Sequence, residues 1–194
     1  PVPSNHKRFV EQRPRDISLN MAAGERSGTL TLHVIHGQTP YVADGTALST
    51  FLDDLAPKSA EVMGGHPVEN IRVDVRTLAE ICAASCREPV DFLKIDVEGW
   101  EEQVLRGADF SKIRPVVIVV EATKPDVSFK GFDQIDAIAD WHDWEPLLLK
   151  AGYRFAYFDG LNRFYVRNED AEALLPLFAL PVGLYDGVQL TNPL

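Results

Sequence analysis

The sequence predicts an α/β fold built on a three-layer, Rossmann-like sheet that is mostly parallel and carries an antiparallel hairpin at one edge. Strand-like and helix-like segments alternate along much of the chain, which is typical of parallel strands joined by crossover helices. Residues 90–97 and 115–123 are largely apolar, as in central strands covered on both faces. Residues 153–167 form two strand patterns around a short turn, which only antiparallel strands permit.

Length and charge narrow the class of protein. The 194 residues are expected to form a single domain, 1–194. Acidic residues number 29 against 19 basic ones, so the formal net charge is −10. This balance opposes binding to nucleic acid or to anionic membranes, and favours a small-molecule or carbohydrate partner. Two cysteines four positions apart, no signal peptide and no membrane-spanning run lead us to expect a cytoplasmic protein with reduced thiols.

The first half of the chain is expected to supply a short helix and then strands. The helix would begin with Ser4 as its N-cap and point Phe9 and Val10 inward. Strands are expected at residues 16–24, 28–37 and 70–78. Residues 37–70 are rich in turn formers, which indicates a long loop with at most a short helix.

The second half is expected to alternate helices with the apolar strands. Helices are expected at residues 77–86, 99–110, 132–152 and 169–181. Thr77 is suited to cap the first of these helices. Gly107 and Gly152 suit the ends of the second and third.

Acidic residues stand where the apolar strands end. Asp96 and Glu98 follow one strand pattern, and Glu121 ends the run "VVIVVE". In open α/β sheets, ligands bind beyond the carboxyl ends of the strands. These acids are therefore expected to converge on one rim, where unpaired buried charges are costly unless they have a function.

Each candidate residue also has a structural interpretation. Asp96 and Glu98 are typical of the cap and first turn of a helix. Lys94 shares a face with Asp96, and we expect it either to pair with an acid or to keep the acids ionised for chemistry. Trp100 is expected either to pack the following helix against the core or to offer a flat ring against which a substrate stacks. Asn162, in the turn "DGLN", suits the turn or a substrate contact.

Several segments together resemble the FkbM-type methyltransferases. These segments are "DFLKIDVEGWEEQVLRGA", "RPVVIVVEAT" and "GYRFAYFDGLNRFYV", with "LNMAAGERSGTLTL", "ALSTF" and "VDVRTL" upstream. The resemblance runs from Pro1 to about Leu180. It implies a class I, Rossmann-like enzyme that uses S-adenosylmethionine to methylate hydroxyl groups of sugars or natural products. Motifs of nucleophilic hydrolases, P-loop proteins and zinc peptidases do not occur.

The resemblance also assigns residues to the cofactor. Asp96 would lie beside the methionine end of S-adenosylmethionine, with Asn20 and Ala22 near its adenine. In the family, a first strand and a glycine-rich cofactor loop would come before "PVP". The sequence is therefore expected to be an N-terminally truncated methyltransferase domain.

For the reaction itself, the carboxylates are the candidate catalytic groups. Glu98 is the expected general base for a hydroxyl, with Asp96 and Glu121 as positioning groups or ligands of Mg²⁺. The residues do not decide between a metal-free and a metal-assisted route, and the five scattered histidines show no metal spacing. Two alternatives remain open: a carboxylate- or metal-dependent hydrolase, and a non-catalytic scaffold module of a larger biosynthetic protein.

Overall fold

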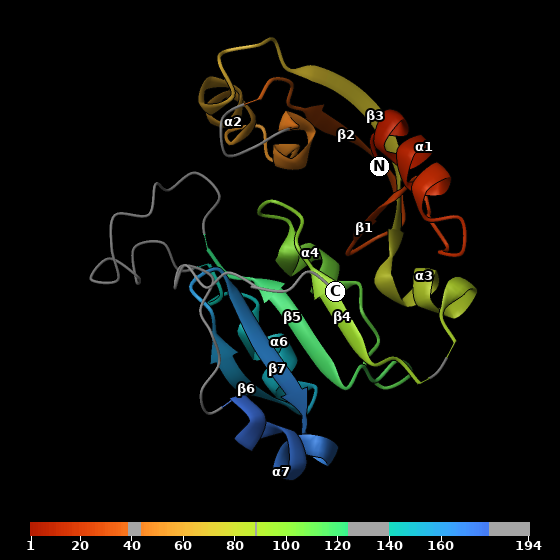
Figure 1. The fold of residues 1–194 in the computed structure, drawn as a ribbon, viewed down its shortest axis with the longest axis vertical. Helices are drawn as coiled ribbons and strands as arrows, with labels where there is room; N and C mark the ends of the chain where they lie inside the picture. Colours follow the sequence, from red (N-terminus) through yellow and green to blue (C-terminus); the bar gives the residue numbers. More distant parts are fainter. Residues whose placement is uncertain (39–43, 88, 124–139, 179–194) are drawn as a thin grey trace, which may run out of the picture.

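The computed structural model describes residues 1–38, 44–87, 89–123 and 140–178, and in these ranges the chain forms two β-sheets and six α-helices (Figure 1). The first sheet has the order β1-β3-β2, with β1 (Ala22–Gly24), β2 (Gly28–Val34) and β3 (Glu69–Thr77). The second has the order β4-β5-β7-β6, with β4 (Phe92–Ile95), β5 (Val117–Glu121), β6 (Tyr153–Phe158) and β7 (Asn162–Arg167). The α/β class is as predicted.

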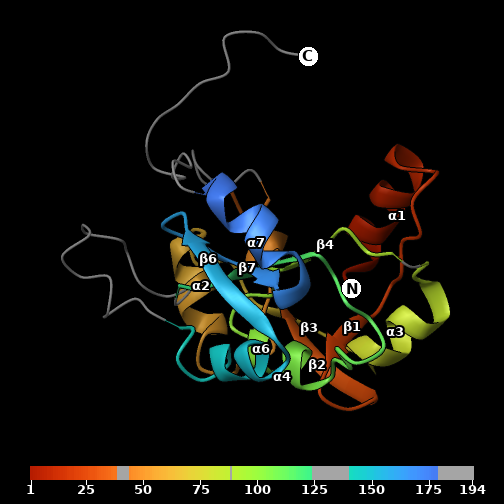
Figure 2. The same cartoon turned by 90° about the horizontal axis from the view of Figure 1, so that it is seen from below.

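The helices lie around these sheets and are mostly short. They are α1 (Pro3–Gln12), α2 (Ala56–Val62), α3 (Leu78–Ser85), α4 (Glu101–Arg106), α6 (Glu145–Lys150) and α7 (Ala171–Leu174). Helices α4 and α6 lie on one side of the second sheet, and α7 lies on the other side, beside β6 and β7 (Figure 2). Of the helix predicted at 132–152, residues 132–139 lie outside the described residues, and the described part contains the shorter helix α6. No described helix is long and apolar enough to cross a membrane.

The prediction of a single, mostly parallel sheet is wrong. Strands β1 and β3 are parallel, as are β4 and β5, but the pairs β2–β3, β5–β7 and β6–β7 are all antiparallel. The antiparallel edge hairpin, by contrast, is as predicted. Strands β6 and β7 pair with each other and together form one edge of the second sheet, with β7 beside β5 and β6 outermost. Strand β7 also runs antiparallel to β5, so the sheet as a whole is mixed.

Only one of the two apolar segments became a central strand. In β5, Ile118 and Val120 are fully buried and the strand has a neighbour on each side. Strand β4 pairs only with β5 among the described residues, and its Phe92 is 67% exposed. The prediction of a central position for both segments is therefore wrong for β4, because an apolar run does not identify the neighbour that covers it.

A contact between a helix and a strand joins the two sheets. Gly107 ends α4, as predicted, and a Cβ atom placed on it would come within 2.1 Å of the carbonyl oxygen of Gly24 in β1. A side chain at this position would collide with backbone, so only glycine lets the helix end pack so closely on the strand. The Gly107 carbonyl also accepts a hydrogen bond of 2.9 Å from the Ala79 amide in α3.

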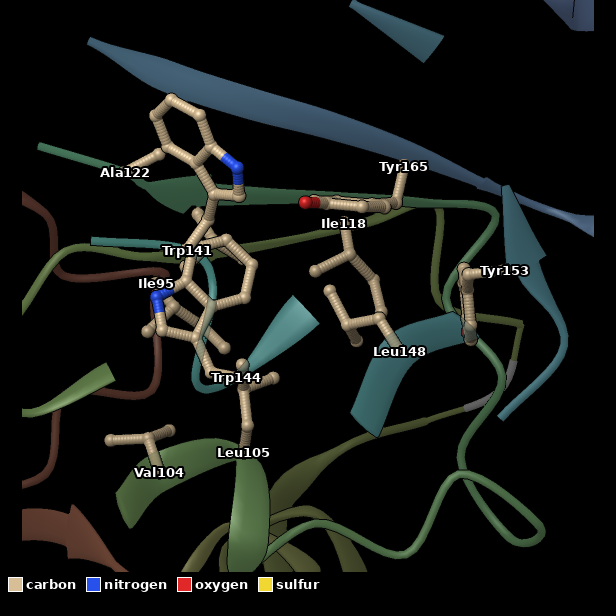
Figure 3. Close-up of a cluster of buried hydrophobic side chains, with 11 residues drawn as sticks. Ile95, Val104, Leu105, Ile118, Ala122, Trp141, Trp144, Leu148, Tyr153 and Tyr165 are labelled. Atoms are coloured by element: carbon tan, nitrogen blue, oxygen red, sulfur yellow. The ribbon is translucent and has the colours of Figure 1, made fainter. Parts of the chain in front are cut away.

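One apolar cluster fixes the second sheet against α4 and α6. Trp144, which precedes α6, and Leu148 of α6 lie with Ile118 of β5 between the sheet and the helices (Figure 3). The Trp144 ring meets the ring of Tyr165 in β7 edge-on, with centroids 6.0 Å apart. Since β5 is held along its whole length, the position of its last residue, Glu121, is fixed by this core.

The N-terminal helix departs from the prediction. It begins at Pro3, before Ser4, with Val2 as the N-cap residue and no side-chain cap. Proline is favoured at the first helical position because its fixed φ matches the helix and its missing N–H has no partner there. Phe9 and Val10 were expected to point inward, but they are 55% and 48% exposed. The strand expected at 16–24 is also shorter, because only Ala22–Gly24 pairs with β3.

The long segment between β2 and β3 is close to expectation. Apart from residues 39–43, which are outside the described residues, it contains a 3-10 turn at Gly45–Leu48 and the helix α2. The two cysteines are free thiols, with Cys82 buried and Cys86 exposed.

Helix α3 begins as the sequence predicts. The Thr77 side chain accepts a hydrogen bond from the Glu80 amide, and the Glu80 carboxylate accepts one from the Thr77 amide. This reciprocal pair satisfies two amides that the helix itself leaves unbonded.

Replacing Thr77 with alanine is expected to lower the free energy of unfolding by about 1 kcal/mol, because one of these amides loses its acceptor. Thr77→Ser keeps the hydroxyl and is the matched control. Urea denaturation of the three proteins is the measurement. An alanine variant as stable as the wild type would show that the cap contributes nothing to stability.

Candidate functional site

Three carboxylates meet at the ends of the two parallel strands of the second sheet. Asp96 follows β4, Glu98 lies two residues further on, and Glu121 is the last residue of β5. One oxygen from each of the three carboxylates lies within 4.8 Å of the others. The last paired positions of these strands are Ile95 and Val120, so Asp96 and Glu121 follow side by side. The structure therefore brings Glu121 together with Asp96 and Glu98, which come more than twenty positions earlier in the sequence.

These acids belong to the face of the sheet that is turned away from α4 and α6. Side chains alternate along a strand, and Ile95 packs into the cluster of Trp144 and Leu148. Lys94 and Asp96 therefore point to the opposite face. Glu121 and Asn162 are direct partners in the ladder between β5 and β7, which puts Asn162 beside the acids.

Glu98 has an unusual backbone conformation. Its φ is 54°, and among the described residues it alone has a positive φ without being glycine. This conformation costs about 1–3 kcal/mol and persists only where surrounding structure imposes it. Here the hydroxyl of the fully buried Thr50 donates a hydrogen bond of 2.9 Å to the Glu98 carbonyl oxygen. Gly99 follows, with a φ of 89°. The loop thus holds Glu98 in one defined position.

A fourth acid, Glu101, braces the same loop from the first turn of α4. It is buried, and its Oε1 accepts a hydrogen bond of 2.9 Å from the Val97 amide. Burial raises the pKa of Glu101, and its hydrogen bonds to backbone amides oppose that rise. Its role is therefore to shape the loop that presents Asp96 and Glu98.

Burial and mutual repulsion make Glu98 and Glu121 hard to ionise. Burial raises the pKa of Glu98 to about 7, and the negative charges of Asp96 and Glu101 add to the effect. Burial raises the pKa of Glu121 to about 9, and the charges of Glu98 and Asp96 again add. Glu121 is 9% exposed, and its Oε2 is buried with no hydrogen-bond partner among the described residues.

Lys94 pairs with an acid, which is one of the two roles expected from the sequence. Its ammonium group lies 3.0 Å from Asp96 Oδ2 and donates a second hydrogen bond to Asn162 Oδ1. It lowers the pKa of Glu98, but burial and the neighbouring acids outweigh it. The pair was expected to be buried, yet the side chains of Lys94 and Asp96 are 36% and 43% exposed. An edge strand leaves these charges open to water.

Replacing Lys94 with methionine is therefore expected to lower the free energy of unfolding by less than about 1 kcal/mol, because exposed ion pairs contribute little. Chemical denaturation measures it, with Arg8→Met as a control for loss of another exposed ion pair, that with Asp44. A loss of several kcal/mol for Lys94→Met alone would show that the lysine compensates buried charge.

A cavity of about 510 Å³ reaches two of the acids. Its lining includes Asp96 and Glu98 together with Met21, Phe51 and Trp100. The rings of Phe51 and Trp100 are in contact, with centroids 5.3 Å apart. Ligand pockets typically measure about 300–1,000 Å³ and combine apolar walls with a few polar groups. This cavity has that size and composition.

The remaining sequence-predicted residues lie at different distances from this cavity. Ala22 and Trp100 line it, while Asn20 is exposed and is not part of the lining. The indole N–H of Trp100 is buried without an acceptor among the described residues. Asn162 is not part of the lining either. Its side chain donates a hydrogen bond to Asp159, whose own carboxylate accepts from the amides of the hairpin turn.

Sequence reasoning missed Thr50, Phe51 and Glu101. Thr50 and Phe51 lie some fifty residues before the loop that they contact, and no local pattern marks them. For Glu101 the sequence offers one weak indication. An acid in the first turn of a helix is favoured by the helix dipole, so its presence there is expected. That indication does not show that the side chain turns back to the Val97 amide.

A second hollow, of about 590 Å³, lies away from the acids and is lined by Arg106, Asp109 and Arg114, among other residues. Both arginines are already paired, Arg106 with Glu102 and Arg114 with Glu169. The charges of these two arginines are therefore already compensated within the protein.

An α/β chain with carboxylates at its strand ends, beside a cavity with aromatic walls, has the architecture of an enzyme domain for a small molecule. The family model described as the methyltransferase FkbM domain matches residues 1–155 of this chain. The chain belongs to the FkbM methyltransferase family, and its domain is a methyltransferase domain. No curated protein and no solved structure shows significant similarity to it.

Proposed function

We propose that the protein is an S-adenosylmethionine-dependent O-methyltransferase that acts on a hydroxyl group of a sugar or natural product. Membership of the family supports methyl transfer. The observation that supports a hydroxyl acceptor is the Glu98 carboxylate in the wall of the cavity. A hydroxyl must lose its proton as it is methylated, and a carboxylate at hydrogen-bond distance can accept that proton.

The residues of the cavity fit S-adenosylmethionine. Its adenine is flat and largely apolar, and the cavity supplies Ala22, Met21 and the ring of Phe51. Its methionine end carries positive charge, and Asp96 supplies a carboxylate. The buried indole N–H of Trp100, which has no acceptor among the described residues, is a donor available to a ligand. When bound, the cofactor supplies an electrophilic methyl group.

The residues of the chain itself orient the acceptor and move its proton. The strained turn at Glu98, held by Thr50, fixes the carboxylate, so that little reorganisation is needed when the acceptor binds. Glu98 accepts the hydroxyl proton while the acceptor oxygen gains the methyl group. Phe51 and Trp100 form an apolar wall that keeps water from the reacting oxygen.

Transfer of a labelled methyl group from S-adenosylmethionine tests this function. The full-length protein would be incubated with hydroxylated acceptors and with matched analogues in which one hydroxyl is replaced by hydrogen. We expect label in the hydroxylated acceptors alone, and loss of label when the methylated hydroxyl is removed. Label on an amine, or acceptor cleavage that needs no S-adenosylmethionine, would contradict the proposal. Cleavage would favour the hydrolase, and failure to bind the cofactor would favour a scaffold role.

A further inference from the structure

The buried end of β5 carries a carboxylate whose charge no described residue compensates. Glu121 is 9% exposed and its Oε2 has no hydrogen-bond partner among the described residues. Placing a carboxylate in such a position is costly unless a cation or a proton compensates it. The Lys94 ammonium group, on the neighbouring strand, contacts Asp96 and Asn162, and no described ion pair joins it to Glu121.

The carboxylates around Glu121 have the spacing of a cation site. Asp96, Glu98 and Glu121 each offer one oxygen, and these oxygens lie within 4.8 Å of one another. Two oxygens on opposite sides of one ion are separated by about twice the metal–oxygen distance, which is about 4 Å for Mg²⁺ and about 5 Å for Ca²⁺. The three oxygens can therefore surround a single ion with small side-chain movements.

We propose that Asp96, Glu98 and Glu121 bind one divalent cation that prefers oxygen ligands, such as Mg²⁺ or Mn²⁺. The ligand set contains only carboxylate oxygens, which suits these hard cations rather than zinc or copper. Glu121 approaches from the protein interior, whereas Asp96 is 43% exposed and lines the cavity with Glu98. The open coordination positions thus face the cavity.

The site also suggests what the cation does, and this part rests on the proposed function. A cation at these carboxylates coordinates the acceptor hydroxyl and makes its proton more acidic. If Glu98 binds the cation through one oxygen, its second oxygen can accept that proton. Acceptors with two neighbouring hydroxyl groups are the class expected to bind best, because both oxygens can coordinate one ion.

Cation binding can be measured without any methyl transfer, so its outcome is separate from that of the proposed function. The full-length protein would be stripped with EDTA and titrated with MnCl₂ and with MgCl₂ by calorimetry. We expect one saturable site and a melting temperature that rises with Mn²⁺ concentration. No saturable heat and no shift in melting at millimolar Mn²⁺ would overturn the proposal.

Variants locate the site. Glu121→Gln and Asp96→Asn are each expected to weaken Mn²⁺ binding at least tenfold. Glu121→Gln keeps the size of the side chain and removes one acid from a cluster of acids, and Asp96 is exposed, so both variants should fold, which the melting curve without metal will verify. Glu102→Gln is the control: Glu102 lies in the first turn of α4, pairs with Arg106 and is not one of the three acids, so this variant should bind Mn²⁺ as the wild type does. Wild-type affinity in either folded variant would overturn the assignment.

Discussion

Replacing Glu98 with glutamine is expected to lower the rate of methyl transfer by about 10²- to 10⁴-fold, the usual effect of losing a general base. Glutamine keeps the size of the side chain but cannot accept the hydroxyl proton. The backbone at this position is held by the Thr50 hydroxyl, which the substitution leaves in place. A single-turnover assay at saturating S-adenosylmethionine isolates the transfer step.

Two further variants control for this result. Glu98→Asp keeps a carboxylate on a shorter side chain and is expected to retain more activity than Glu98→Gln. Glu102→Gln removes an acid from the first turn of α4, the helix that follows Glu98, where it pairs with Arg106, and is expected to leave the rate unchanged. A near-normal rate for Glu98→Gln would show that another group takes the proton.

Replacing Leu148 with alanine is expected to lower the free energy of unfolding by about 2–5 kcal/mol. Its side chain is fully buried among Trp144, Ile118 and Tyr165, and the truncation leaves a cavity between α6 and the sheet. The neighbouring Leu149 lies on the same short helix but is 48% exposed.

Leu149→Ala is therefore the matched control, with an expected change within about 0.5 kcal/mol, as for other surface positions. Urea denaturation with two independent probes gives both values. Similar losses for the two variants would contradict the burial of Leu148 and the packing of α6 on the second sheet.

The sequence predicted much of the local structure because the responsible interactions are local. The capping of α3 depends on Thr77 and Glu80, three positions apart. The hairpin of β6 and β7 depends on a short turn, in which the Asp159 carboxylate binds the amide that follows it by three residues. The end of α4 depends on Gly107. Each pattern involves residues within a few positions of one another, so it can be recognised from the sequence without knowing the tertiary structure.

The order of the strands could not be predicted in the same way. The sequence shows that β4, β5 and β7 are strands, but the choice of neighbour is made by pairing between segments far apart in the chain. Apolar composition favoured a central position for β4 and for β5 alike. In the fold, β5 has β4 on one side and β7 on the other, whereas β4 has only β5 as a neighbour among the described residues, and its Phe92 is exposed.

For the candidate site, the sequence by itself determined which residues carry charge and that Asp96, Glu98 and Glu121 follow strands. Only the tertiary structure decided that their oxygens lie within 4.8 Å of one another and that Glu121 is buried while Lys94 is exposed. It also brought Thr50 to the Glu98 carbonyl across 48 positions of sequence. The physical reason is that burial, and with it the cost of a charge, depends on which distant segments pack around a residue.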